Sequence, residues 1–392
     1  MNIAVSPASR LQAPDMNELT PYDQGLPLAS AKTEGEAITL GWENGDKATL
    51  AFIWLRDHCA CPQCRHPQTR ERLLTPLSEV SAPKAVTLAN GHLYIEWADG
   101  HASAFHSGWL HQRRPGAQAG SPLPEPRAWR DAFTPTRVRH AEFLTLPGER
   151  EWLDAVLRDG LALVTDAPLE EEEITRLAAR IGPSRATNFG DRFDVRSQPN
   201  PNNAAYTAVG LALHIDLPNW RQPPDIQLLY CLENDASGGG SLFADGLRVV
   251  EALRREDPQA LSILSRTPID FRFQDEYHDI RTRVPVIQLD EAGEVIDIRL
   301  NNWIRDALDL PSNEMAAWYR AYRLLWTLFH SEAHQLEFDL LPGQMVAFDN
   351  RRVLHGRRAF DPESGARHLQ GLYLDRDLLV SRRRVLDREP AF

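Results

Sequence analysis

Cysteine is scarce in this sequence, and its few copies are unevenly spread. Only four of the 392 residues are cysteine, and Cys59, Cys61 and Cys64 lie within one short segment. Thiols this close together are poorly placed for a disulfide framework but suit a metal site. Cys231 lies in an apolar run and is expected to be a buried thiol. We therefore expect a reducing compartment and a cytoplasmic protein.

An excess of positive charge and long hydrophobic runs are also missing. The formal net charge is -12 at pH 7, which argues against nucleic-acid and anionic membrane partners. No apolar stretch approaches the length of a membrane-spanning helix. The N-terminus lacks the basic region and following apolar region of a signal peptide. We expect no nucleic-acid and no membrane partner, whereas a cationic small molecule is compatible with this charge.

Composition predicts four successive parts of the chain. Residues 1–36 are polar and are expected to be disordered, and residues 37–114 predict a small β-rich domain. The segment 115–128 is rich in Pro, Gly, Ala and Ser, which is typical of a linker. Residues 129–392 follow as the larger domain. The strands expected in the small domain are 38–42, 48–54, 85–88, 92–97 and 101–105.

The larger domain mixes strand and helix patterns, and propensity alone supports an α+β, strand-rich class. The strands expected there are 161–165, 225–232, 240–244, 284–289, 295–300, 345–348 and 368–374. The helices expected there are 142–160, 169–181, 247–255, 259–265 and 312–336. Because strands dominate the second half, helices are expected to lie beside a sheet structure.

The cysteine cluster lacks one ligand for a tetrahedral zinc ion, which takes four. The fourth ligand must come from elsewhere, and the candidates are His101, His106, His58 and His66. The alternative is that the three thiols are reduced and bind no metal. A zinc with four protein ligands would be structural, tying the cysteine loop to a domain too small for a large core.

A second candidate metal site combines distant segments. His214 and Asp216 flank a single residue, so on an extended strand their side chains point to the same face. His355 ends an apolar run far downstream, and Arg367 follows it at short spacing. With 13 histidines in the chain, about one His-x-Asp pair arises by chance, so the pair alone is weak evidence. The full order of residues favours Fe(II), because two histidines and one carboxylate with open positions suit an oxygen-activating iron.

These motifs resemble those of the 2-oxoglutarate-dependent oxygenases, and among them the gamma-butyrobetaine dioxygenase family. The resemblance covers roughly residues 37–385. The segments that carry it are Trp54-Leu-Arg-Asp-His-Cys-Ala-Cys-Pro-Gln-Cys, Asn202-Asn-Ala-Ala-Tyr-Thr, His214-Ile-Asp, Pro223-Pro-Asp-Ile-Gln-Leu-Leu-Tyr-Cys, Phe348-Asp-Asn-Arg and His355-Gly-Arg-Arg.

The resemblance implies a double-stranded β-helix (jelly-roll) oxygenase domain over residues 129–392 and a structural zinc with His101 as its fourth ligand. It implies that His214, Asp216 and His355 hold Fe(II), and that 2-oxoglutarate is converted to succinate and CO2. Arg367 would pair with the far carboxylate of 2-oxoglutarate, as a guanidinium can do in a planar geometry, and Ser241 would donate its hydroxyl to this cosubstrate. Ascorbate would support activity, and a homodimer is expected.

The family also implies a trimethylammonium substrate, which aromatic faces bind because it has no hydrogen-bond donors. Tyr206 and Tyr373 match cage positions, and Phe189 and Phe193 stand where the animal enzymes carry Tyr and Trp. Their alternative role is ordinary core packing. Two further positions near the polar end of the substrate are Asn203 and one residue of the pair Asn301-Asn302, and the sequence leaves open which of the two points inward.

The leading hypothesis is hydroxylation of gamma-butyrobetaine to L-carnitine. The alternatives within the superfamily are a trimethyllysine hydroxylase and an oxygenase for a trimethylammonium phosphonate. The phosphonate would favour extra cations, for which Arg192 and Arg305 are candidates. A hypothesis of a different class is a non-catalytic scaffold that uses only the zinc cluster.

Overall fold

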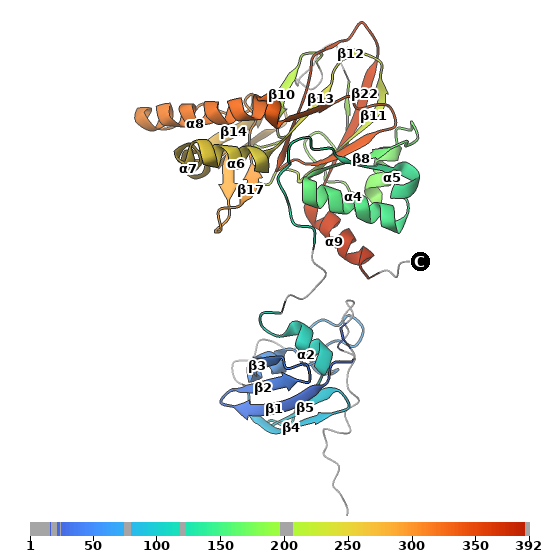
Figure 1. Ribbon diagram of the computed structural model, residues 1–392, viewed down its shortest axis with the longest axis vertical. Helices are drawn as coiled ribbons and strands as arrows, with labels where there is room; N and C mark the ends of the chain where they lie inside the picture. The colour runs from blue at the N-terminus through green and yellow to red at the C-terminus, as the bar shows by residue number, and fades with distance from the viewer. Residues whose placement is uncertain are drawn as a thin grey trace, which may run out of the picture. The chain divides into compact units, whose positions relative to one another are not determined.

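The computed structural model describes residues 16, 22–23, 25–73, 80–117, 123–196 and 207–388. The chain forms two compact units, Met1–Pro122 and Leu123–Phe392 (Figure 1). Within the described ranges, no helix combines the length and the apolar character needed to cross a bilayer.

The first unit packs two antiparallel three-stranded meanders with two short helices. The first meander is β1 (Leu28–Glu34), β2 (Ala37–Trp42) and β3 (Lys47–Ala51), and the second is β4 (Pro83–Ala89), β5 (His92–Trp97) and β6 (Ala102–His106). The helices are α1 (Phe52–Asp57) and α2 (Ser107–Arg113). Alternating residues of β2, such as Ile38 and Leu40, are fully buried in a shared core with Leu93 and Ile95 of β5, as expected for strands with one buried face.

Two expectations for this unit are wrong. Residues 28–34 belong to the stretch expected to be disordered, but they form β1 by pairing with β2 in register from Ser30 to Glu34. The strand expected to run to Trp54 stops at Ala51, and α1 begins at Phe52. The physical reason is tertiary: Leu55 is fully buried and Phe52 nearly so, and a helix brings both side chains to the same core.

The second unit is built on two sheets whose strands are mostly antiparallel, and together they form the predicted jelly roll. The larger sheet has the order β7-β8-β19-β11-β22-β9, and the smaller has β10-β20-β13-β18. The bounds of these strands are β7 Thr136–Arg139, β8 Leu161–Thr165, β9 Arg192–Val195, β10 Leu211–His214, β11 Ile226–Asn234, β13 Ser241–Asp245, β18 Gln335–Phe338, β19 Met345–Asp349, β20 Val353–Arg357 and β22 Arg367–Leu374.

Strand alternation gives the larger sheet two different faces. In β8, Leu161 and Leu163 face the interior between the two sheets, whereas Ala162 and Val164 face the helices that cover the outside. Those helices are α3 (His140–Phe143), α4 (Leu146–Asp159), α5 (Glu173–Ala179) and α9 (Arg376–Leu386). The helix α4 ends where Gly160 adopts a left-handed φ of 73°, so the chain can turn directly into β8.

A second group of helices covers the smaller sheet: α6 (Gly246–Glu256), α7 (Pro258–Arg266) and α8 (Ser312–His330). Figure 1 shows these three helices gathered on one side of the unit, with α4, α5 and α9 on the other. The helix expected over 312–336 is too long, because α8 ends at His330 and Gln335–Phe338 form β18. β18 pairs with β13 and completes the sheet edge, a non-local contact that overrides local helix propensity.

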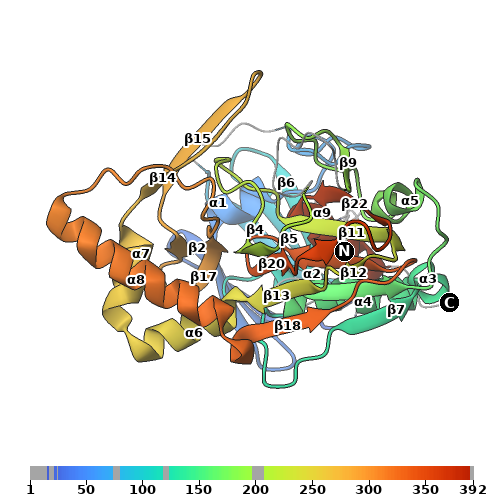
Figure 2. The same ribbon diagram turned by 90° about the horizontal axis from the view of Figure 1, so that it is seen from above.

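Short paired strands complete this unit: β12 (Ser237–Gly238) with β21 (Phe360–Asp361), β14 (Ile269–Gln274) with β15 (Asp279–Val284), and β16 (Ile287–Leu289) with β17 (Val295–Ile298). A 3-10 turn, η3 (Glu332–His334), precedes β18. The β14–β15 hairpin projects outward from the helices around it (Figure 2). The hairpin nevertheless matters for the site, because Phe273, close to its turn, lines a cavity described below.

Candidate metal centres and the cavities between the sheets

The smaller sheet brings His214 and His355 together, although they are far apart in sequence. His214 is the last residue of β10, and it lies directly opposite His355 of β20. The two imidazole centroids are 4.2 Å apart. Asp216 lies just beyond the end of β10, with Oδ1 3.4 Å from Nε2 of His214 and 3.8 Å from Nε2 of His355. His214 and His355 therefore each direct one ring nitrogen, and Asp216 directs one carboxylate oxygen, at a common point.

Hydrogen bonds fix the orientation of two of these groups. Nδ1 of His214 lies 2.9 Å from the carbonyl oxygen of Ala212, so Nδ1 carries the proton and Nε2 has a free lone pair. Asn350 is fully buried and holds the backbone of Asp216 on both sides. Its Oδ1 accepts from the Asp216 amide at 2.7 Å, and its Nδ2 donates to the Asp216 carbonyl at 3.0 Å.

Electrostatics keep this cluster in the protonation states that bind a cation. Burial raises the pKa of Asp216, but the nearby His355 and His214 and the Tyr373 hydroxyl outweigh it and hold the pKa below its usual value. Burial and the adjacent His214 lower the pKa of His355 to about 3. At neutral pH the cluster therefore contains an ionised carboxylate and, at His355, a neutral imidazole, which are the forms that ligate metals.

The cluster fits a divalent transition metal. Nitrogen and oxygen ligands at bond lengths of about 2.1 Å lie about 3 Å apart when they are adjacent in an octahedral shell. The separations of 3.4 and 3.8 Å from Asp216 Oδ1 are close to this value. Among the described residues, the group that offers ligand atoms here consists of His214, Asp216 and His355 alone. Three ligands on one side leave positions for other molecules.

A cavity with aromatic sides opens from one side of the cluster. Phe193 lies against Tyr373 with ring centroids 5.4 Å apart, and Phe189 lies against Phe273 at 5.6 Å. Gly371 makes this arrangement possible, because a Cβ there would come within 2.3 Å of the Phe193 ring. The residues that line the cavity are Phe189, Phe193, Val195, Leu211, His214, Asp216, Leu217, Asn219, Phe273, Asn301, Trp303, Ile304 and Tyr373.

A second cavity borders the same cluster and contains two arginines. Arg367 is 8% exposed, and no described carboxylate pairs with it. Its guanidinium lies over the ring of Phe360 at 5.6 Å, and burial lowers its pKa from the ordinary value. Burial and the charge of Arg367 lower the pKa of Arg357 to about 10, so that side chain stays cationic at neutral pH.

The second cavity also contains the predicted Ser241, which is largely buried in β13. The glycines before it are required by the fold. Gly239 has a left-handed φ of 78°, and a Cβ there would lie 3.3 Å from Nε of Arg367. The lining residues are Phe193, Val195, Leu211, His214, Asp216, Gln227, Leu229, Ser241, Phe243, His355, Gly356, Arg357, Arg367 and Leu369.

The structure brings most of the predicted substrate residues to the aromatic cavity. Phe189, Phe193 and Tyr373 line it, whereas Tyr206 and Asn203 lie outside the described residues. Asn301 is buried and lines the cavity, while Asn302 is exposed, which answers the question that the sequence left open.

The two arginines considered for a phosphonate are placed elsewhere. Arg192 donates to Glu172 at 2.9 Å, and the Arg305 guanidinium lies over the rings of Trp318, Tyr319 and Tyr322. Neither of them lines the aromatic cavity.

Sequence reasoning missed several residues of the site. Asn350 lies within the quoted Phe348-Asp-Asn-Arg segment, but nothing in this local pattern shows that it binds the Asp216 backbone. Gln227 is 2% exposed and lines the second cavity, and its side-chain oxygen has no partner among the described residues. A polar residue in the apolar run of β11 was the available signal for Gln227. Phe273 and Trp303 come from distant segments, and no local pattern links them to His214.

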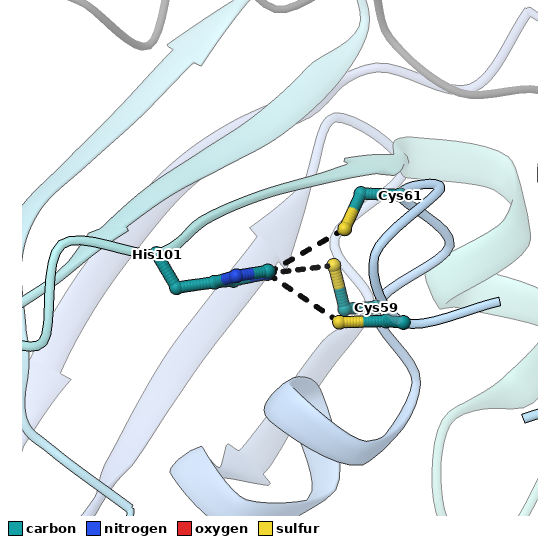
Figure 3. A group of neighbouring side chains, drawn as sticks. Cys59, Cys61 and His101 are labelled. Atoms are coloured by element: carbon teal, nitrogen blue, oxygen red, sulfur yellow. Dashed lines mark hydrogen bonds between the residues drawn. The ribbon is translucent and has the colours of Figure 1, made fainter. Parts of the chain in front are cut away.

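The cysteine cluster forms a second, separate group in the first unit. Nε2 of His101 lies 3.3, 3.7 and 3.6 Å from Sγ of Cys59, Cys61 and Cys64, and Figure 3 shows the imidazole pointing at the three sulfurs. A tetrahedral zinc with its usual bond lengths places sulfur and nitrogen ligands about 3.5 Å apart. The cluster therefore fits zinc with all four positions filled by protein.

The other histidines considered for the zinc cluster have different contacts. His106 caps α2 by accepting from the Gly108 amide at 3.1 Å. His58 stacks on Trp54 at 4.3 Å, and His66 accepts from the amides of Gln68 and Thr69. Arg56 donates to Sγ of Cys64 at 3.4 Å, so a guanidinium lies beside the cysteine cluster.

A jelly roll with two histidines and one carboxylate at the end of its smaller sheet belongs to the class of non-haem iron oxygenases. Comparison with known proteins makes this assignment more specific. Residues 122–373 match the family described as taurine catabolism dioxygenase TauD, TfdA, and residues 29–111 match the gamma-butyrobetaine hydroxylase-like N-terminal family.

Similar curated proteins agree with both matches. The chain is 41% identical to gamma-butyrobetaine dioxygenase of Pseudomonas sp. (strain AK-1), covering 92% of this chain and 97% of that protein. It is 32% identical to the human gamma-butyrobetaine dioxygenase, covering 91% and 96% of the two chains. A solved non-haem iron oxygenase, OrfP, aligns with a TM-score of 0.49 at 14% identity, covering 64% of this chain and 96% of that one. The chain belongs to the gamma-butyrobetaine dioxygenase family of Fe(II)/2-oxoglutarate-dependent oxygenases.

Proposed function

We propose that this protein hydroxylates gamma-butyrobetaine to L-carnitine, using Fe(II) and 2-oxoglutarate and releasing succinate and CO2. One observation carries the proposal: two neighbouring cavities share His214 and Asp216 in their linings and differ in charge. One contains two buried arginines, whereas the other contains aromatic rings and no arginine or lysine among its described lining residues. An anionic cosubstrate and a cationic substrate can therefore approach the same point from two cavities.

Each protein ligand has a defined task in this proposal. Nε2 of His214, Nε2 of His355 and Oδ1 of Asp216 would hold Fe(II), which when bound supplies oxygen activation coupled to 2-oxoglutarate decarboxylation. Asn350 fixes the backbone of Asp216, so its carboxylate needs little reorganisation to bind a cation.

The second cavity is suited to a dicarboxylate with one end at the iron. Arg367 has paid the cost of burial without a carboxylate partner among the described residues, and a bound carboxylate would relieve it. Ser241 and Gln227 add polar groups to the lining of this cavity. We infer that Arg367 pairs with the far carboxylate of 2-oxoglutarate and that Ser241 donates its hydroxyl to it.

The aromatic cavity is suited to a quaternary ammonium group. The rings of Phe189, Phe193 and Tyr373 offer π faces that attract a cation without hydrogen bonds. Phenylalanine binds cations more weakly than tryptophan, but Trp303 also lines this cavity. The amides of Asn301 and Asn219 supply polar contacts for the other end of the substrate. We propose that Tyr206 and Asn203 also contact the substrate.

The lining favours gamma-butyrobetaine over the two alternatives. Trimethyllysine carries a second ammonium group, which calls for a carboxylate partner, but Asp216 is the one acidic residue among the described lining residues. A phosphonate calls for added cations, and the described lining residues of this cavity include no arginine or lysine. A single carboxylate is better matched to neutral amides.

The test is succinate formation in the presence of Fe(II), ascorbate and 2-oxoglutarate, with each of the three trimethylammonium compounds. We expect gamma-butyrobetaine to be turned over fastest and to give carnitine in a ratio near one to succinate. Preferred turnover of trimethyllysine or the phosphonate would keep the oxygenase and replace the substrate. Absence of 2-oxoglutarate consumption with every compound would overturn the function.

Other features stay predictions that accompany this function. We propose a small zinc-binding domain at residues 37–114, with a structural zinc at Cys59, Cys61, Cys64 and His101, joined by the 115–128 segment to the oxygenase domain. Homodimeric assembly and a cytoplasmic location are further predictions. Light scattering of the purified protein and cell fractionation would test these last two.

A further inference from the structure

The two carboxylate oxygens of Asp216 have different surroundings. Oδ1 is the oxygen near both histidines, at 3.4 Å from His214 Nε2 and 3.8 Å from His355 Nε2. Oδ2 accepts a hydrogen bond from the hydroxyl of Tyr373 at 2.7 Å. The carboxylate is thus oriented with one oxygen toward the metal position and the other toward a neutral donor.

The fold fixes the position of this donor. Tyr373 is 3% exposed and lies near the end of β22, where it pairs with Gln227 of β11 in the larger sheet. The Tyr373 ring faces Phe193, and Phe193 packs against Gly371, which lies in β22 like Tyr373. Tyr373 belongs to the larger sheet, while His214 and His355 belong to the smaller sheet. The hydrogen bond to Asp216 therefore joins the larger sheet to the metal cluster.

The number of oxygens that Asp216 offers determines how many positions remain for other molecules. An octahedral ion has six positions, and the cluster fills three if each side chain gives one atom. A 2-oxo acid that binds through two oxygens then leaves one position for dioxygen. If Asp216 gave both oxygens, the protein would fill four positions, and these two molecules could not bind together.

We propose that the Tyr373 hydroxyl keeps Oδ2 of Asp216 away from the iron, so that this carboxylate is a single-oxygen ligand. This inference deepens the proposed function and rests on its iron assignment. Tyr373 then has two roles: its ring contributes to the aromatic cavity, and its hydroxyl positions a metal ligand. The two roles belong to different atoms and can be separated by substitution.

The test compares Tyr373→Phe with Phe193→Leu. The first variant keeps the ring and removes the hydroxyl, whereas the second replaces the neighbouring ring and keeps the Tyr373 hydroxyl that bonds Asp216. The readouts are the visible absorption of the Co(II)-substituted protein, which reports the ligands and geometry around the metal, and 2-oxoglutarate binding to the anaerobic Fe(II) protein. Binding of gamma-butyrobetaine to the same samples is the third readout.

We expect Tyr373→Phe to change the cobalt spectrum, because Oδ2 of Asp216 can then replace a solvent ligand, and to weaken 2-oxoglutarate binding about tenfold, as for loss of a hydrogen bond to a charged group. Binding of gamma-butyrobetaine should change less than about twofold, because the π face is kept. Phe193→Leu should give the reverse result: an unchanged cobalt spectrum and gamma-butyrobetaine binding weakened about fivefold.

A Tyr373→Phe protein with the wild-type cobalt spectrum and wild-type 2-oxoglutarate affinity would overturn the inference. If this variant unfolds more easily than the wild type, fluorinated tyrosine at position 373 keeps the side chain and changes only the strength of the donor. A wild-type protein that binds 2-oxoglutarate but does not hydroxylate gamma-butyrobetaine would refute the proposed substrate and leave the role of Tyr373 intact. The cobalt comparison needs neither substrate nor turnover, so it decides the inference in either case.

Discussion

The molecule has two clusters of metal-ligating side chains, and they differ in how many ligands the protein supplies. Cys59, Cys61, Cys64 and His101 bring four ligand atoms together in the first unit, whereas His214, Asp216 and His355 bring three together in the second. Four ligands complete a tetrahedron and leave no position for a substrate. Three ligands with cavities on both sides leave positions for chemistry.

The neighbours of the two clusters differ in the same sense. At the cysteine cluster, Arg56 donates to Sγ of Cys64 and so holds one ligand in place. At the open cluster, Asn350 and Tyr373 bind Asp216 and set its orientation. The comparison indicates that the number and orientation of the protein ligands, more than their affinity for a metal, distinguish a structural metal site from a reactive one.

The largest effect is expected from breaking the open cluster with His214→Ala. Loss of one of three ligands should reduce succinate formation by more than about a hundredfold, beyond the 10–100-fold typical of residues that only orient ligands. The midpoint of thermal unfolding should stay close to that of the wild type. His278→Ala, on the exposed turn of the β14–β15 hairpin, is the control. Normal turnover by His214→Ala would refute the iron assignment.

The next effect concerns Arg367, the buried cation in the second cavity beside the open cluster. Arg367→Met should raise the KM for 2-oxoglutarate about 10- to 100-fold, since a hydrogen-bonded ion pair with a charged ligand is lost. The KM for gamma-butyrobetaine should change little, because Arg367 does not line the aromatic cavity. Initial-rate kinetics with each substrate varied in turn measure the difference. Equal increases in both constants would mean that the cosubstrate anchor is elsewhere.

Breaking the closed cluster should affect stability more than chemistry. Cys61→Ser should lose the bound zinc and lower the unfolding midpoint of the first unit by about 10 °C or more, because metal-binding energy contributes to folding. Metal analysis and calorimetry measure the two effects. Cys231→Ala is the matched control, since this buried thiol lies outside the cluster. Retention of zinc by Cys61→Ser would exclude Cys61 as a ligand.

The smallest expected effect concerns Gln227, which lines the second cavity. Gln227→Met should raise the KM for 2-oxoglutarate about fivefold, as for the loss of one neutral hydrogen bond. The control is Gln370→Met. Gln370 is also buried, but it lines neither cavity, and its side-chain amide donates to Asp194 at 3.2 Å. A KM that changes equally in both variants would show that Gln227 acts through packing.

Sequence alone predicted the parts of this protein that depend on local pattern. The strand at Leu161–Thr165 has the bounds that were expected, because its apolar run is bounded by Gly160 and a polar turn. The order His214-x-Asp216, His355 and Arg367 predicted the class of enzyme, the larger set of quoted segments predicted the family, and the comparisons confirm both. The close spacing of the three cysteines predicted a metal cluster because residues that are close neighbours in the sequence are also neighbours in space.

Only the tertiary structure determined which residues from different segments lie beside one another. It directed Asn301 rather than Asn302 into the aromatic cavity, and it joined Tyr373 of β22 to Asp216 at the end of β10. It also showed that residues 28–34 form a strand and that α8 gives way to β18. These features depend on strand pairing and packing between residues far apart in the chain. Local propensity contains no information about such partners, whereas the closed jelly roll fixes them.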